Sequence, residues 1–239
     1  MNKNNLDKKL AEWIKELPQN SKKSLLVHLD NLKSIYPFNK YEYRLMYLLD
    51  EKIITFKEYE KLRDAYVNAN PYLNLYSISP RVFGEIWAQQ HLIDVNTKFK
   101  KPSKEIDKKY SGDYDLYLEN GTRIIKIEVK ACRAINTKLR GGLETKALDF
   151  RSNQPYWMNF QQIKLDIADI FIFVGVWVDK ILYWVLTNEE IKQHPTRSHQ
   201  HRGGIEYQIG ITEKNIVEFN KFLVKSSKLV KIIKTKINR

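Results

Sequence analysis

The sequence is poor in cysteine and in acidic residues, and it contains no long apolar run. The single cysteine, Cys132, excludes an intramolecular disulfide and a zinc site built on cysteines. No apolar stretch approaches the roughly 18 to 20 residues that a membrane-spanning helix needs. The first residues, MNKNNLDKKLAEW, lack the apolar stretch of a secretory signal. We therefore expect a cytoplasmic protein.

The shortage of acidic residues leaves a strong excess of positive charge. The 239 residues include 41 Lys and Arg against 28 Asp and Glu, which gives a formal net charge of +13. Such a charge attracts polyanions and indicates nucleic acid as a partner. The hydrophobic content of 43% indicates a folded chain with one sizeable core, or a core domain with a smaller attachment. We find no internal repeat, no Gly-rich phosphate loop and no Ser/His/Asp pattern.

A predicted β-hairpin is the feature around which the rest of the chain is organised. Residues 113–118 and 123–130 alternate between polar and apolar, and residues 119–121 (Glu-Asn-Gly) supply a turn between them. Because successive strand residues point to opposite faces, one face is apolar and the other is charged. The apolar set, expected in the core, is Leu116, Leu118, Ile125, Ile127 and Val129. The charged set is Asp113, Asp115, Lys126, Glu128 and Lys130.

The charged face of this hairpin has the composition of a metal site. With a two-residue turn at residues 120–121, Asp113 lies opposite Glu128, and Asp115 lies within diagonal reach of it. Crowded carboxylates repel one another unless a divalent cation lies between them, and Mg²⁺ takes one or two carboxylates with waters and phosphate. Lys130 would then stand beside the metal, where it can activate a water and stabilise an anionic transition state. The alternative is a solvated strand face of alternating charge.

The spacing of these residues resembles a known signature. Asp115, followed by Glu128-Val129-Lys130 at the end of the next apolar strand, looks like the motif of the PD-(D/E)XK nuclease superfamily, and the size and charge resemble a type II restriction endonuclease. The resemblance implies Mg²⁺-dependent hydrolysis of DNA phosphodiesters. The Asp and the Glu would be metal ligands together with a backbone carbonyl near Val129, and the Lys would lie near the attacking water. No Pro precedes either Asp, so Asp113 stays a second candidate; we favour Asp115 because it directly precedes an apolar strand residue.

The same superfamily implies a role for an acid on the helix before the hairpin. Residues 80–92 form an expected helix, with Val82, Ile86 and Gln89 on one side and Glu85 beside them. In many nucleases of the superfamily a Glu at such a place reaches a metal or orders a water. This makes Glu85 a catalytic candidate. The alternative is a surface acid or a partner of the helix dipole.

The N-terminal part of the chain is helical by period. Apolar residues recur at helical spacing, and Thr55 with Glu58 makes a capping-box start for one of the helices. The Asn-, Ser- and Pro-punctuated stretch 70–80 indicates a linker. We therefore divide the chain into a helical N-terminal subdomain, residues 1–75, and a nuclease-like core with a basic C-terminal helix, residues 76–239. The subdomain would brace the core, form a dimer or read DNA through a helix-turn-helix.

The remainder of the chain alternates strands and helices. The nearly continuous apolar run 169–178 is typical of a strand buried on both faces. Residues 181–186 and 205–211 are further strands, a short helix occupies 188–191, and the tail 212–239 has an amphipathic helical pattern. This order predicts an α/β fold with a mixed central β-sheet flanked by helices, like the restriction-endonuclease core of the resembled superfamily.

Three polar segments are candidates for contact with DNA. They are the basic stretch 133–157, an expected helix at 157–167, and the loop 194–204, which holds three of the five histidines. Basic side chains contact phosphates, and Arg or Asn also reads base edges. Solvated loops are the alternative, and zinc at His199 and His201 lacks a third ligand. The candidates are Arg133, Lys138, Arg140, Lys146, Arg151, Asn153, Gln161, Gln162, Lys164, Arg197, His199, His201 and Arg202.

These features predict a Mg²⁺-dependent, sequence-specific endonuclease that acts on double-stranded DNA, as type II restriction enzymes do. By analogy with the resembled family, an enzyme with one site per chain pairs to cut both strands, so a homodimer is expected. A cell would need a cognate DNA methyltransferase to protect its own sites, and this sequence carries no evidence on one. The alternatives are a repair or junction-resolving nuclease, a non-catalytic DNA-binding module, and an enzyme that acts on RNA.

Overall fold

The chain divides into two compact units. The structure is a computed structural model that describes residues 3–31, 37–200 and 206–238. The first unit takes its described residues from 1–77, 136–154 and 177–180, and the second from 78–135, 155–176 and 181–239. The boundary at residue 77 falls inside the predicted linker. The residues before it are packed, since Leu73 and Tyr76 are buried and the Tyr72 N–H donates to the Val178 carbonyl at 2.9 Å.

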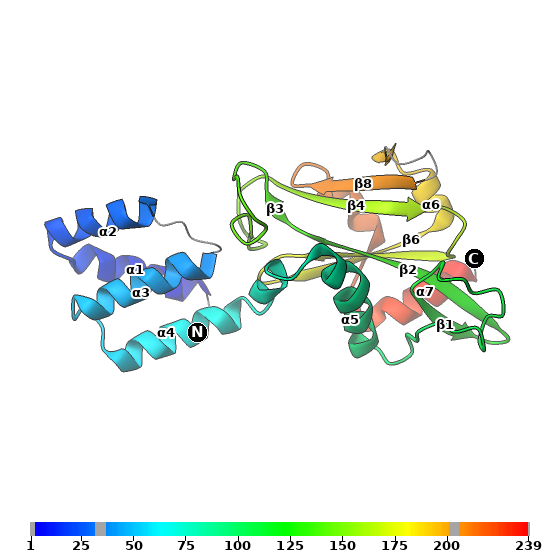
Figure 1. Cartoon of the computed structure of the whole chain (residues 1–239), viewed down its shortest axis with the longest axis horizontal. Coiled ribbons are helices and arrows are strands. Elements are labelled where there is room, and N and C mark those ends of the chain that lie inside the picture. Colours follow the sequence, from blue (N-terminus) through cyan, green and yellow to red (C-terminus); the bar gives the residue numbers. More distant parts are fainter. Residues whose placement is uncertain (1–2, 32–36, 201–205, 239) are drawn as a thin grey trace. The chain divides into compact units, whose positions relative to one another are not determined.

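Helices form most of the first unit (Figure 1). The capping box predicted at Thr55 is present: its hydroxyl accepts from the Glu58 N–H, and the Glu58 carboxylate accepts from the Thr55 N–H at 2.9 Å. Glu42 joins two of the helices by accepting from Tyr59 at 2.7 Å and from Arg63 at 3.0 Å. The helices are α1 (Lys3–Glu16), α2 (Gln19–Asn31), α3 (Pro37–Asp50) and α4 (Phe56–Ala69), followed by the 3₁₀ turn η1 (Leu73–Tyr76). No helix in the described ranges is long and apolar enough to cross a membrane.

The second unit is built on a mixed five-stranded sheet, as the α/β prediction requires. The β2–β5 pair is parallel and the other pairs are antiparallel. In order across the sheet, the strands are β1 (Leu116–Asn120), β2 (Arg123–Arg133), β5 (Ile170–Val176), β6 (Ile181–Thr187) and β9 (Leu223–Val224). A second sheet has the order β3 (Ile135–Asn136), β4 (Tyr156–Lys164), β8 (Glu206–Thr212) and β7 (Arg197–His199).

The five-stranded sheet is covered on both faces. Figure 1 shows β4 and β8 of the second sheet on one side and helices α5 (Ala88–Val95) and α7 (Leu229–Ile237) on the other. Every residue of β5 is buried, as its apolar run predicted. Between the two sheets, Phe160 stacks on Phe173 with ring centroids 4.5 Å apart. The remaining helical elements are the π-helix η2 (Val82–Trp87), α6 (Asn188–Lys192) and the 3₁₀ turns η3 (Ile216–Phe222) and η4 (Ser226–Lys228).

Two helix predictions are wrong in this unit. Residues 157–167 do not form a helix, because most of them belong to strand β4, where Tyr156, Met158 and Phe160 are buried at period two. A β-bulge between Phe160 and Ile163 shifts that period by one residue, which imitates helical spacing in the sequence. The tail beyond residue 212 is not one long helix but two 3₁₀ turns, the short strand β9 and α7.

Candidate active site

The hairpin forms as predicted on its apolar face, but its register differs. Leu116, Leu118, Ile125, Ile127 and Val129 are all buried. The turn lies one residue later than expected, at residues 121–122, because the strand partner of residue 120 is residue 123. The φ of +64° at residue 121, a glycine, suits a tight turn there.

The corrected register places the second aspartate, not the first, beside the glutamate. Leu116 is opposite Ile127, so Asp115 lies opposite Glu128 at the next position. The Asp115 N–H still donates to the Ile127 carbonyl at 3.0 Å, but the described residues before Asp115 do not pair with β2. The Asp115 carboxylate takes that place, since its Oδ2 accepts from the Val129 N–H at 2.8 Å. Asp115 therefore closes the end of the ladder with its side chain.

Glu128 and Lys130 make a buried ion pair next to this aspartate. Lys130 Nζ lies 2.6 Å from Glu128 Oε1, and the two side chains are only 17% and 9% exposed. Burial is the main cause that raises the pKa of Glu128 to about 7; the Lys130 ammonium opposes the rise, and the Asp115 carboxylate adds to it. Burial also raises the pKa of Asp115, against the lowering effects of the Val129 N–H and the Lys130 charge. The buried Glu128 carboxylate and the half-buried Asp115 carboxylate thus share one site with one cation, the Lys130 ammonium.

Two residues that the sequence did not single out complete the site. Gln89 of α5 is buried, and its Nε2 donates to Asp115 Oδ1 at 2.5 Å. The Gln89 Oε1 accepts in turn from the ammonium of Lys101, which belongs to the segment between α5 and β1. The Asp115 carboxylate is therefore held by a backbone N–H on one oxygen and by a side-chain amide on the other. Gln89 stands close to the apolar Ala88 and Leu92, which are buried on the same helix, and a polar residue among such neighbours was the signal in the sequence.

Glu85 is not brought together with these carboxylates. Its side chain is 62% exposed, and its Oε2 accepts from Arg81 Nε at 2.8 Å. The helix around it is a π-helix, in which the Ala88 N–H donates five residues back to the Phe83 carbonyl. The extra residue in that turn rotates the helix faces, so that Val82 and Ile86 are exposed and were wrongly expected beside Gln89. The position that reaches the site is therefore one α-helical turn after Glu85.

Asp113 lies outside the strand pairing. Its carboxylate is exposed and accepts from the Ser111 hydroxyl. Burial raises the pKa of Tyr110, and the negative charges of Asp115, Asp113 and Glu128 add to the rise. Asp113 thus belongs to the surroundings of the site and not to its buried centre.

The donor set fits a hard divalent cation of low protein coordination. No cluster of three or more His, Cys, Asp and Glu side chains arranged for a metal occurs in the described part of the chain. Asp115 and Glu128 offer two carboxylates, and Mg²⁺ is held by one or two carboxylates with waters and substrate phosphate. The raised pKa values of both groups mean that a cation between them would relieve an unfavourable burial of negative charge. The residues present therefore suit Mg²⁺ better than a zinc site.

The predicted DNA-contact residues fall into different surroundings. Arg133 is buried in β2; its guanidinium donates to the Ile78 carbonyl at 2.8 Å and lies 3.9 Å from the Phe83 ring centre, so it is committed to packing. The prediction of Arg133 as a loop residue facing DNA is wrong. Lys146 is half-buried, and its carbonyl accepts from the Asn136 N–H at 2.8 Å. The exposed ones in the first unit are Lys138, Arg140, Arg151 and Asn153.

The other predicted contact residues lie in the second sheet. Gln161, Gln162 and Lys164 are exposed on β4, at and after its bulge, and not on a helix. On β7, the Arg197 guanidinium lies 4.5 Å from the Tyr207 ring centre, and the His199 ring packs on the same tyrosine at 4.7 Å. The last two, His201 and Arg202, lie outside the described residues.

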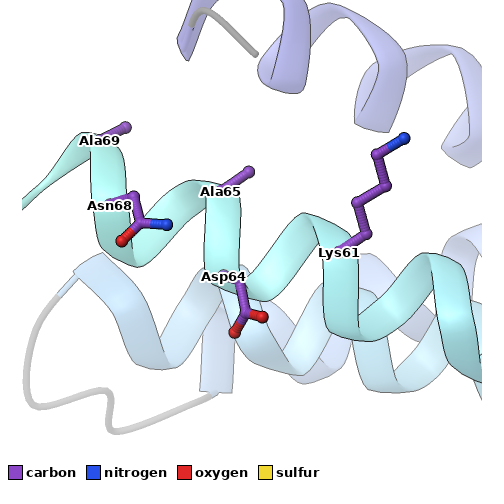
Figure 2. A pocket seen from close by; sticks show the side chains of 5 residues that line it. All are labelled: Lys61, Asp64, Ala65, Asn68 and Ala69. Carbon is purple, nitrogen blue, oxygen red and sulfur yellow. The ribbon is translucent and has the colours of Figure 1, made fainter.

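A separate hollow of about 450 Å³ lies in the helical unit and not at the carboxylates. Figure 2 shows the side chains that line it on successive turns of α4. They are Lys61, Asp64, Ala65, Asn68 and Ala69. One acid and one lysine on a single helix make no catalytic arrangement, so the chemistry is concentrated at Asp115, Glu128 and Lys130.

Comparison with known proteins does not give the chain a family. No protein-family model and no curated protein matches the sequence. Among solved structures, the chain is similar to a bacterial homing endonuclease, I-Ssp6803I, with 10% sequence identity and a TM-score of 0.38. The match covers 67% of this chain and 97% of that one.

Proposed function

We propose that this chain is a Mg²⁺-dependent endonuclease of the PD-(D/E)XK type that hydrolyses phosphodiester bonds of double-stranded DNA. The observation that carries the proposal is the group formed by the buried Glu128 and the half-buried Asp115 and Lys130 at the end of the β1–β2 pairing. Buried like charges reduce stability, and such strongly perturbed groups are concentrated at functional sites. The net charge of +13 supports a polyanionic substrate.

Asp115 and Glu128 would hold the metal ion. The backbone carbonyl near Val129 is our proposed third protein ligand, and Asp113 would act at longer range through its charge. When bound, the ion would supply a Lewis acid for the phosphate and lower the pKa of a bound water. The hydrogen bonds from Val129 and Gln89 fix the Asp115 carboxylate before the metal arrives, which lowers the cost of ordering it.

Lys130 is the residue that we assign to the reacting phosphate. Its ammonium already lies 2.6 Å from Glu128, in a place where little water competes. A cation held in such an environment stabilises the negative charge that develops on the phosphate oxygens as water adds to phosphorus and the bond to the leaving sugar oxygen breaks. Lys130 would also orient the attacking water by hydrogen bonding.

Within this reaction class, we propose the task of a type II restriction enzyme. One carboxylate site per chain cuts one strand, so cutting both strands calls for a homodimer. A cognate DNA methyltransferase would then protect the DNA of the same cell. A repair or junction-resolving nuclease has the same chemistry but recognises branched or damaged DNA instead of a short sequence.

Incubation of unmethylated phage DNA with the purified protein tests the proposal. We expect discrete fragments in Mg²⁺ and intact DNA when EDTA replaces the metal. A continuous smear would contradict the restriction task but keep the nuclease chemistry. Intact DNA in Mg²⁺ with retarded migration would contradict the nuclease and favour a DNA-binding module without catalysis.

A further inference from the structure

Residues 98–109, which we call the lysine segment, connect α5 to β1 and carry an unusual concentration of positive charge. Two acids, Glu105 and Asp107, accompany the lysines. The six lysines are Lys98, Lys100, Lys101, Lys104, Lys108 and Lys109. Of this segment, only Lys101 takes part in the site described above.

The lysine segment is held in place against the hairpin. Phe99 is 1% exposed, and the backbone of Lys100 pairs with that of Tyr117 through hydrogen bonds of 3.1 and 2.9 Å, which adds a bridge to β1. At the other end, Asp107 Oδ2 lies 2.7 Å from Lys126 Nζ, and the Asp107 N–H donates to the Ser103 carbonyl at 3.0 Å. The segment is thus an ordered surface of the second unit.

Its outward charge is strongly positive. Asp107 is neutralised by Lys126 from outside the segment, and Lys100 is paired with Glu119 at 2.7 Å. Lys98, Lys104, Lys108 and Lys109 have exposed side chains, and none of them has an ion-pair partner among the residues that the structure describes. Against these four ammonium groups the segment exposes only Glu105.

The same segment touches the carboxylate site. Lys101 donates to Gln89, which in turn donates to Asp115. Just after the segment, Tyr110 lies close enough to the site that the charges of Asp115 and Glu128 add to burial in raising the pKa of its phenol. A polyanion that lies along these lysines would therefore lie beside the carboxylates of Asp115 and Glu128.

We propose that the lysine segment binds the phosphate backbone of double-stranded DNA and sets that backbone beside Asp115 and Glu128. The inference rests on the proposed function and names a surface for its substrate. Lysine ammonium groups contact phosphates as point charges, so the segment positions the duplex without reading its sequence. An anionic membrane is a poorer partner, because Ile106 is the one large apolar side chain that this segment exposes, and insertion at a lipid interface needs an apolar face.

The test is the salt dependence of DNA binding by a triple variant, Lys104→Gln, Lys108→Gln and Lys109→Gln. Affinity for a 30-base-pair duplex is measured in EDTA over a series of salt concentrations. Each lost phosphate contact lowers the slope of log affinity against log salt by about 0.9, so we expect a slope smaller by about 2 to 3. The decrease should be the same for duplexes of unrelated sequence, because phosphate contacts carry no sequence information.

A control variant removes the same charge from the helical unit. Lys8→Gln, Lys23→Gln and Lys57→Gln change three exposed lysines of α1, α2 and α4, and we expect the wild-type slope. Equal losses in both variants would overturn the proposal, because the effect would then come from net charge alone. A triple variant that keeps its DNA affinity but no longer binds vesicles of anionic lipid would also overturn it.

Cleavage of the same duplex by the wild-type protein in Mg²⁺ is measured in parallel. If the wild type cleaves and the segment variant binds DNA with the wild-type slope, the proposed DNA-binding role of the lysine segment is wrong, while the proposed nuclease activity is kept. If the wild type neither binds nor cleaves DNA, both inferences are wrong. All the substituted lysines are exposed, and thermal unfolding of each variant confirms that the fold is intact.

Discussion

At the scale of single residues, the site consists of two carboxylates, one held by neutral hydrogen-bond donors and the other by a lysine. Asp115 receives a hydrogen bond on each oxygen, from the Val129 N–H and the Gln89 amide, while Glu128 has Lys130 at 2.6 Å. Such an arrangement keeps two carboxylates close together without a full set of cationic partners. The free energy stored in this crowding is available to bind a cation.

The pH dependence of stability follows from the raised pKa of Glu128. The ordinary value is 4.5 and the folded value is about 7, so between these pH values the folded state binds more protons than the unfolded state. The stabilisation from this group is fully present below about pH 4.5 and is lost as pH rises through about 7. We expect the metal-free protein to lose on the order of 3 kcal/mol of unfolding free energy across this interval.

Urea unfolding in EDTA at several pH values measures this effect. The Glu128→Gln variant, which carries no titratable group there, should show a much flatter profile. A wild-type stability that rises steadily from pH 5 to 7, with the same profile in Glu128→Gln, would contradict the placement of this carboxyl group in a buried site.

Gln89 should act on catalysis as a positioning residue. In Gln89→Leu, Asp115 loses a hydrogen-bond donor and Lys101 loses its acceptor, so we expect kcat to fall by about 10- to 100-fold. Without that donor the ionised form of Asp115 is less favoured, and the acidic limb of the pH–rate profile should move to higher pH.

The neighbouring glutamine provides the control. Gln90 is exposed and pairs with Asp94 on the solvent side of the same helix, so Gln90→Leu should leave both kcat and the pH–rate profile unchanged. Equal effects of the two substitutions would show that Gln89 acts only through the stability of α5.

At the scale of elements, the sequence predicted the buried face of each hairpin strand better than the register in which the two strands pair. Period two in β1 and β2 placed Leu116 and Ile127 in the core, because burial of one face leaves no other solution. The position of the turn depends on which residue takes the φ of +64°, and the sequence Asn120-Gly121 is compatible with two turn positions. The chosen answer put Asp113 opposite Glu128, whereas the observed register puts Asp115 there.

The missed residues have similar physical causes. A π-turn inserts one residue into a helix, and nothing in the sequence of η2 and α5 indicates it, so Glu85 was predicted for the position that Gln89 takes. The bulge in β4, with a φ of +55° at Gln162, broke the alternation that would have identified a strand. Lys101 was not predicted as a site residue because it reaches the site only through its hydrogen bond to Gln89.

Strand β5 offers a test of packing between the two sheets. A Cβ at Gly175 would meet the Trp184 ring at 2.6 and 2.9 Å and the Met158 sulfur at 3.1 Å. Overpacking of this kind costs about 1 to 3 kcal/mol, so Gly175→Ala should lower the free energy of unfolding by that amount in urea titrations. In Gly84→Ala the new methyl meets nothing within 4 Å, and we expect no loss of stability. Equal stability of both variants would contradict the close packing of the Trp184 and Met158 side chains against β5.

At the scale of the whole molecule, the distribution of charge agrees with the proposed function. The positive excess is not spread evenly, since the lysine segment lies next to the buried Glu128 and the half-buried Asp115. The helical unit carries its own exposed basic residues, including Lys138 and Arg140 from a later part of the chain. This arrangement is the one that the proposed function needs, with DNA held along the lysines and hydrolysed at Asp115 and Glu128.

The most direct test of the account is the rate of DNA cleavage in Mg²⁺ for Lys130→Met beside Lys236→Met. Both lysines have side chains 17% exposed, and both lie 2.6 Å from a glutamate, Glu128 and Glu190 respectively. We expect Lys130→Met to lose about 100-fold or more in cleavage rate with its DNA affinity kept, and Lys236→Met to cleave like the wild type. Wild-type cleavage by Lys130→Met, or an equal loss in both variants, would contradict the assignment of the active site.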